Sequence, residues 1–160
     1  QIGFSLGLVG IGAAVVQAGL MGLILKRLGT VRTALFGFGV NVIALLAYAL
    51  AGQPWMVYVI IPFGALGGVA GPAMNSLMST LTPANAQGEL QGASSSLNAM
   101  AMIIGPITMN SVLFSFTHDG APVHFAGAAF LLASGLTALA LLPFLRGVAV
   151  NREAIPDPAE

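Results

Sequence analysis

Long uncharged and mainly apolar segments alternate along the chain with short stretches that hold every charged residue. The uncharged runs cover residues 1–25, 33–88, 90–118 and 120–145. A helix needs about 20 mainly apolar residues to cross the hydrocarbon core of a bilayer. The run 33–88 is therefore long enough for two spans, and the turn-forming string Ala51-Gly52-Gln53-Pro54 divides it.

This pattern predicts an all-α membrane protein with five transmembrane helices. We place them at about residues 3–25, 33–51, 55–80, 90–115 and 124–145. Residues 1–145 would form one partial bundle, because no long polar linker interrupts the spans. The segment 146–160 holds half of all charges, so it predicts a flexible tail.

Composition narrows the class of protein further. Of the 160 residues, 57% are hydrophobic and 6% are charged, whereas an average soluble domain has about 25% charged residues. The lipid bilayer is therefore an expected partner. Five Lys and Arg residues balance five Asp and Glu residues, so no basic field for nucleic acid exists. The absence of cysteine excludes disulfides and thiolate metal sites.

The distribution of basic residues predicts the orientation. All five lie at positions 26–32 or after residue 145, which five spans place on one side of the membrane. Positive residues favour the cytoplasmic side. We therefore expect an integral plasma-membrane protein, as in the bacterial inner membrane, with a cytoplasmic C-terminus and an outer N-terminus. With this orientation the chain would enter its first span directly from the outer side. We therefore expect at least one further helix upstream of residue 1.

Polar side chains inside the predicted spans form a candidate substrate pathway. They are Gln17, Asn41, Asn75, Gln91, Ser95 and Asn98. Gln91, Ser95 and Asn98 recur at helical spacing and share one face of the fourth span. An amide in lipid needs a hydrogen-bonding partner or water. Two interpretations remain open: hydrogen bonds between helices, or the wall of a water-filled cavity.

Proline and glycine indicate how the spans bend and pack. Pro62, Pro72 and Pro106 lie inside spans, where each removes a backbone hydrogen bond and bends its helix. Glycines four residues apart, such as Gly67 and Gly71, allow helix backbones to approach closely. Such faces serve either static packing or a moving interface.

The middles of the spans contain no Asp, Glu, Lys, Arg or His. Proteolysis by paired carboxylates or by a Ser-His pair is thus excluded within them. The two histidines, His118 and His124, flank an outer loop, so no metal or haem site is expected in the membrane. We predict neither an enzyme nor a bound cofactor.

Two loop sequences resemble those of a known family. Arg27, Gly29 and Arg32 match the signature loop of the major facilitator superfamily, with Lys26 where that motif has Asp. The string 87–92, Gln-Gly-Glu-Leu-Gln-Gly, is similar to a string of the tetracycline-resistance branch of drug:proton antiporters. The resemblance covers residues 5–146 and implies that the five spans correspond to helices 8–12 of a twelve-helix transporter.

The resemblance also implies a function and partners. It implies efflux of small hydrophobic drugs in exchange for protons by rocking of two helical halves, one of which is a missing N-terminal half. For the loop residues Arg27, Gly29, Arg32 and Glu89 it implies a gating contact. Alternatively, the arginines set topology only, and Glu89 interacts with the helix dipole.

Two departures from the branch concern proton coupling. Asn41 stands where tetracycline exporters carry an Asp, and Ala13 where some carry a His. Asn cannot titrate, so we expect a wider drug-exporter role with the proton taken up elsewhere. Two alternatives stay open: a non-transporting membrane module that packs against a partner subunit, and a symporter or uniporter of the same fold.

Overall fold

The computed structural model describes residues 21–151 except 119 and 122, and also the isolated positions 3, 7, 10, 11, 14, 19 and 155. The first predicted span, 3–25, and with it Gln17, lies mostly outside the described residues. The helices of the described part are α2 (Met21–Leu50), α3 (Pro54–Gly67), α4 (Ala70–Leu81), the 3₁₀ turn η2 (Ala84–Ala86), α5 (Gln87–Thr117) and α6 (Ala128–Val150).

Four segments of the described residues are long and apolar enough to cross a membrane. They are Met21–Leu50, Pro54–Leu81, Ala84–Thr117 and Ala128–Val150. They overlap the second to fifth predicted spans, although the first of them begins at Met21 rather than at about residue 33. The prediction of a helical membrane protein is therefore confirmed for the described part. The first of the five predicted spans lies mostly outside the described residues, so the count of five stays a prediction.

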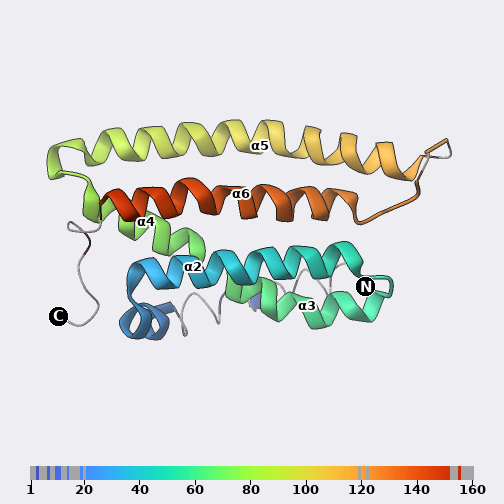
Figure 1. The fold of residues 1–160 in the computed structure, drawn as a ribbon, viewed down its shortest axis with the longest axis horizontal. Helices are drawn as coiled ribbons and strands as arrows, with labels where there is room; N and C mark the ends of the chain where they lie inside the picture. Colours follow the sequence, from blue (N-terminus) through green and yellow to red (C-terminus); the bar gives the residue numbers. More distant parts are fainter. Residues whose placement is uncertain are drawn as a thin grey trace.

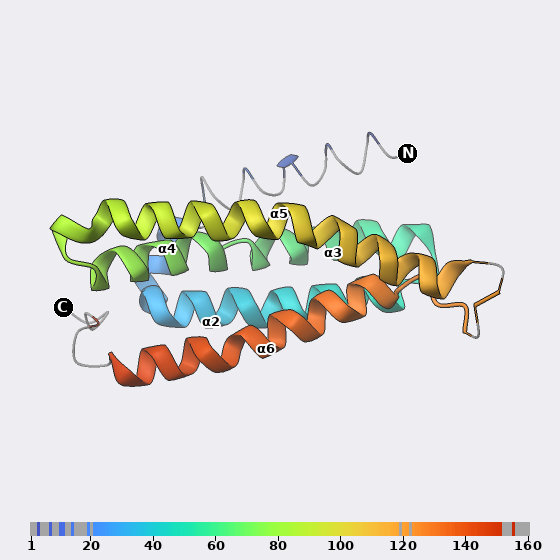
Figure 2. The ribbon, with the colours of Figure 1, turned by 90° about the horizontal axis from the view of Figure 1, so that it is seen from above.

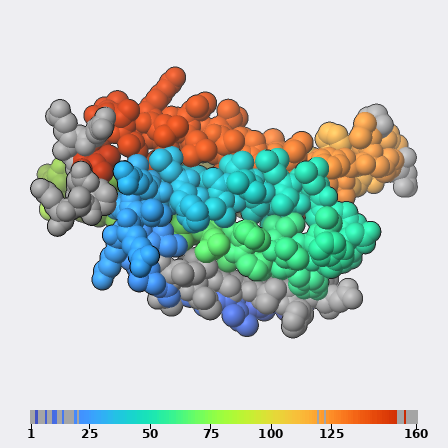
Figure 3. Space-filling view, turned by 60° about the horizontal axis from the view of Figure 1, so that its bottom comes forward, coloured from blue at the N-terminus to red at the C-terminus, as the bar shows by residue number. Residues whose placement is uncertain are grey.

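Helix α2 lies at the centre of the bundle. It contacts α3, α4 and α6, whereas α5 contacts chiefly α6 and, at its first turn, η2 and α4. Figures 1 and 2 show the helices running roughly side by side, with the start of α2, the α4–α5 turn and the end of α6 at one end of the molecule. We call this the charged end, because these segments carry Lys26, Arg27, Arg32, Glu89 and Arg146. Figure 3 shows α2 on the surface between α6 and α3.

Small residues set the distance between α2 and its neighbours. A Cβ atom on Gly37 would lie 2.6 Å from the backbone nitrogen of Ala70, at the start of α4. A Cβ atom on Gly67 would lie 3.1 Å from Asn41 of α2. Gly71 has open space around it, so of the predicted pair Gly67 and Gly71 only the first sits in a helix crossing.

The crossing of α2 and α6 combines close contact with a hydrogen bond. A Cβ atom on Gly127 would overlap the carbonyl oxygen of Ala49. Further along, the buried hydroxyl of Ser134 donates to the carbonyl oxygen of Val42 at 3.1 Å. Such contacts are the main source of helix association where lipid removes the hydrophobic drive.

The predicted loop 26–32 is a sharp kink inside α2 rather than an open loop. Gly29 has φ 73° and ψ 167°, a backbone conformation that L side chains rarely adopt. The fully buried Thr33 lies just beyond it, with its hydroxyl donating to the carbonyl oxygen of Gly29 at 2.7 Å. Helical structure continues on both sides because every residue around Gly29 tolerates a helix.

The third predicted span is divided into two helices. Helix α3 ends at Gly67 and α4 begins at Ala70, so the interruption lies just before Pro72. The ring of Pro72 is incompatible with a helical carbonyl at Gly68, four residues earlier, which accounts for the position of the break. Pro62 and Pro106 lie inside α3 and α5, which continue through them.

Helix α6 begins and ends later than predicted, at Ala128 and Val150. It ends at Val150, so residues 146–150 are helical and the tail starts later than the predicted position 146. The charge of Arg146 does not end a helix, since the residue can extend into water. Asn151 ends it instead: its Nδ2 donates to the carbonyl oxygen of Gly147 at 2.9 Å. Pro143 also lies inside α6, a position that the sequence analysis did not single out.

Candidate functional site

Three of the candidate pathway residues share one exposed face of α5. Gln91, Ser95 and Asn98 are exposed, and none makes a side-chain hydrogen bond to another described residue. No residue of α5 is buried. This polar face is therefore uncovered by the described part of the chain.

Three hydroxyl groups near the end of α5 differ from this face, because they form hydrogen bonds within the helix. The hydroxyls of Ser111, Ser115 and Thr117 each donate to the carbonyl oxygen four residues earlier, at 2.7–2.8 Å. The amides of Gln91 and Asn98 make no such bond. Their donors and acceptors are available to water, to a bound molecule or to another helix.

The remaining pathway candidates lie elsewhere. Asn75 is exposed on α4. Asn41 is partly buried on α2, where its backbone and Cβ face Gly67 of α3. The structure therefore brings Gln91, Ser95 and Asn98 together and places Asn41 in a packing interface. Gln17 lies outside the described residues.

The candidate gating residues all lie at the charged end. Arg27 and Arg32 are exposed on either side of the Gly29 kink, and Glu89 is exposed in the first turn of α5. In the part of the chain that the structure describes, no ion pair connects Glu89 with an arginine. The Arg27 side chain borders an apolar groove with Leu23 and Leu28.

Gln87 holds the α4–α5 turn, a role that the sequence pattern does not indicate. The Nε2 of Gln87 donates to the carbonyl oxygens of Ser79 and Thr82, each at 2.8 Å. The hydroxyl of Ser79 donates to the Oε1 of Gln87 at 3.2 Å. Both Gln87 and Ser79 flank the turn in the sequence, yet only the folded turn brings them together.

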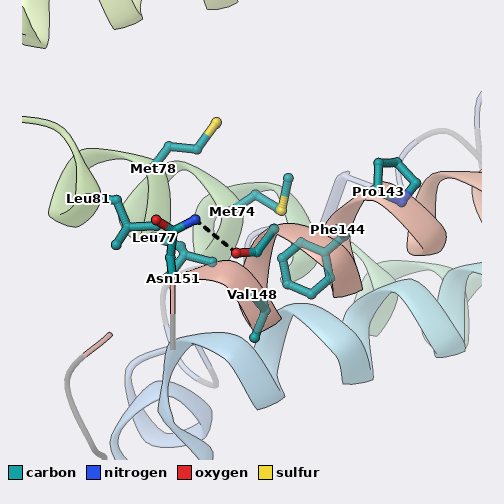
Figure 4. A pocket seen from close by; sticks show the side chains of 9 residues that line it. Met74, Leu77, Met78, Leu81, Pro143, Phe144, Val148 and Asn151 are labelled. Carbon is teal, nitrogen blue, oxygen red and sulfur yellow. Dashed lines mark hydrogen bonds between the residues drawn. The ribbon is translucent and has the colours of Figure 1, made fainter. Parts of the chain in front are cut away.

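An apolar cavity of about 160 Å³ lies between α4 and α6 at the charged end (Figure 4). Its lining residues are Met74, Leu77, Met78, Leu81, Pro143, Phe144, Gly147, Val148 and Asn151. The cavity borders a small core formed by Ala34, Ala73, Leu77 and Phe144. Phe38 packs against this core, with its ring tilted by 49° to that of Phe144 and the ring centroids 5.7 Å apart. It is separate from the polar face of α5.

Comparison with known proteins shows which family the sequence matches. The family model of the Major Facilitator Superfamily matches residues 1–106. Tetracycline resistance protein, class G, of Vibrio anguillarum is 38% identical over 116 residues, which are 72% of this chain and 29% of that protein. The class E protein of Escherichia coli is 30% identical over 142 residues, 89% of this chain and 34% of that protein.

A more distant relative lies outside the bacterial resistance proteins. The human hippocampus abundant transcript 1 protein is 25% identical over 108 residues, 68% of this chain and 22% of that protein. The chain spans about a third of the length of the resistance proteins that it matches. No solved structure gives a significant match. On the family-model match and these relatives, the chain belongs to the Major Facilitator Superfamily, in the neighbourhood of its tetracycline resistance proteins.

Proposed function

We propose that this chain is part of a secondary transporter that exports hydrophobic drugs in exchange for protons. Family membership and the similarity to tetracycline resistance proteins support this function. The transporter would lie in the plasma membrane with its charged end toward the cytoplasm, since all described Lys and Arg residues lie there.

The single observation that carries the proposal is the polar face of α5. A transmembrane helix that turned Asn98, three turns into α5, toward lipid would leave its amide group without a partner, at a cost of several kcal/mol. An aqueous substrate pathway, closed on its other side by helices beyond this segment, would satisfy it. Substrate and water would then contact Gln91, Ser95 and Asn98 alternately as the two halves of the transporter rock against each other.

Proton coupling would take place outside the middles of the described spans. Residues 33–88 and 90–117 contain no Asp, Glu, Lys, Arg or His. Asn41 cannot titrate, and its position against Gly67 suits packing. The proton would be carried by Glu89 at the charged end or by a residue of another part of the transporter.

Transport in inverted membrane vesicles tests the proposal. The longer protein that contains this chain is supplied with a fluorescent hydrophobic drug, and a pH gradient, acidic inside the vesicle, is imposed. We expect drug uptake that collapses when a protonophore dissipates the gradient. Uptake that proceeds equally without the gradient would indicate a uniporter, and absence of uptake for every drug tested would refute the efflux function.

A further inference from the structure

The side chain of Gln87 satisfies several groups that helix termini leave open. The last four carbonyl groups of a helix lack partners within it, and Ser79 belongs to the last turn of α4. Its carbonyl oxygen accepts one long bond, at 3.4 Å, from the backbone N–H of Thr82. Gln87 donates to that carbonyl and to the carbonyl of Thr82, which ends the helix. The Ser79 hydroxyl completes the set by donating to Gln87. One amide thus closes the turn with both donor hydrogens and its acceptor.

Gln87 is also the first residue of α5. Elsewhere α5 is weakly held, because none of its residues is buried and its contacts are mostly with α6. Gln91, the first residue of the candidate pathway face, follows one turn later. The direction in which α5 leaves the turn therefore depends on the hydrogen bonds of Gln87.

We propose that Gln87 is a positioning residue that fixes the start of α5 on the end of α4, so that the candidate pathway face moves together with α4. We call the three hydrogen bonds of Gln87 across the α4–α5 turn the anchor. The importance of Gln87 for transport rests on the proposed function, whereas the existence of the anchor does not. The bonds that carry it are the two from Nε2 at 2.8 Å and the one from Ser79 at 3.2 Å.

Distance measurements between spin labels test the anchor. Residues 1–160 contain no cysteine, so within this segment labels attach only at introduced sites, and any cysteine elsewhere in the longer protein is replaced by serine. One label pair, S76C with S96C, joins exposed positions of α4 and α5, and a second pair, I43C with L139C, joins exposed positions of α2 and α6. Gln87→Met keeps the length of the side chain and removes all three hydrogen bonds. Gln91→Met is the matched control, because Gln91 makes no hydrogen bond to another described residue.

We expect Gln87→Met to broaden the distance distribution of the α4–α5 pair and to leave the α2–α6 pair unchanged. Amide exchange in residues 82–90 should become roughly tenfold faster, as for a segment that loses its fixing hydrogen bonds. Ser79→Ala removes one bond of the three and should give an intermediate effect. Gln91→Met should leave the distribution as in the unmodified chain.

Gln87→Glu provides a readout that a general loss of packing would not give. At pH 7 the carboxylate cannot donate to the two carbonyl groups, so the α4–α5 distribution should be broad. Below about pH 4, near the usual pKa of Glu, one donor returns and the distribution should narrow. The unmodified chain, with its neutral amide, should show no such change.

Two results would overturn the proposal. Equal distributions for Gln87→Met and Gln91→Met would mean that the hydrogen bonds do not fix α5. Broadening of both label pairs would mean that Gln87 supports the whole bundle rather than the α4–α5 turn. Because none of these measurements uses transport, an intact anchor in a protein that moves no drug would refute the efflux function alone.

Discussion

At the residue scale, the kink of α2 depends on one backbone conformation. Gly29 has positive φ, and the hydroxyl of the buried Thr33 binds its carbonyl oxygen. The basic residues Arg27 and Arg32 lie on either side of this turn and extend into solvent. The kink therefore lets the chain change direction at the charged end without an open loop.

Replacing Gly29 should destabilise the protein. Gly29→Ala places a Cβ atom on a residue with φ 73°, which costs about 1–2 kcal/mol in that region. Gly39→Ala is the control, because Gly39 lies in the same helix with open space around it. It should stabilise by up to about 1 kcal/mol through helix propensity. Unfolding of the chain in micelles, followed by circular dichroism, measures both; a neutral Gly29→Ala would contradict the argument.

At the element scale, the sequence predicts which segments span the membrane, but it does not predict where each helix ends. Charged residues and apolar runs report directly on which segments meet lipid, so four predicted spans match the helices of the structure. Charge is a poorer guide to where a helix ends. The sequence predicts span boundaries at Glu89 and Arg146, yet both residues lie inside helices, because a charged side chain at a membrane surface remains in water.

Contacts between elements were the least predictable part. Glycine spacing alone does not distinguish Gly67, which lies against α2, from Gly71, which meets open space. The bonds of Gln87 connect residues eight positions apart and exist only once the turn has formed. The shared face of Gln91, Ser95 and Asn98 did follow from the sequence, because helical periodicity fixes it.

The crossing of α2 and α4 should not tolerate a larger residue. Gly37→Ala would place a Cβ atom 2.6 Å from the backbone of Ala70, where no flexible side chain can give way. We expect a loss of about 1–3 kcal/mol, as for an overpacked core. Gly71→Ala, on the facing helix and in open space, should cause no loss. The same unfolding assay compares them, and equal stabilities would argue against close packing at Gly37.

Filling the cavity between α4 and α6 should have the opposite effect. Gly147 lines the cavity, and an added Cβ there meets nothing within 4 Å. Gly147→Leu should therefore fill part of the space and stabilise by about 0.5–2 kcal/mol. Gly135→Leu, also in α6 and in open space, gains the same helix propensity without the cavity. The midpoint of thermal unfolding of Gly147→Leu minus that of Gly135→Leu measures the effect of filling the cavity. A lower midpoint for Gly147→Leu would contradict the prediction.

At the scale of the whole molecule, α5 is the helix whose surroundings are least complete. Its face with Gln91, Ser95 and Asn98 has no partner among the described residues, while its hydroxyls farther along are satisfied internally. A helix of this kind needs water or another set of helices beside it. Under the proposed function, this face would form one wall of a substrate pathway, and helices beyond this segment would form the opposite wall.

Transport should therefore depend on the amides of α5 more than stability does. In the longer protein, Gln91→Leu or Asn98→Leu removes a hydrogen-bonding group from the pathway wall and should lower drug uptake into inverted vesicles roughly tenfold. Protein abundance in the membrane should stay near that of the unmodified protein, because neither amide supports a described hydrogen bond. Ser111→Ala is the control, since that hydroxyl is bonded within α5. If both leucine variants transported normally at normal abundance, the polar face of α5 would be a surface for another helix, and the substrate would pass elsewhere.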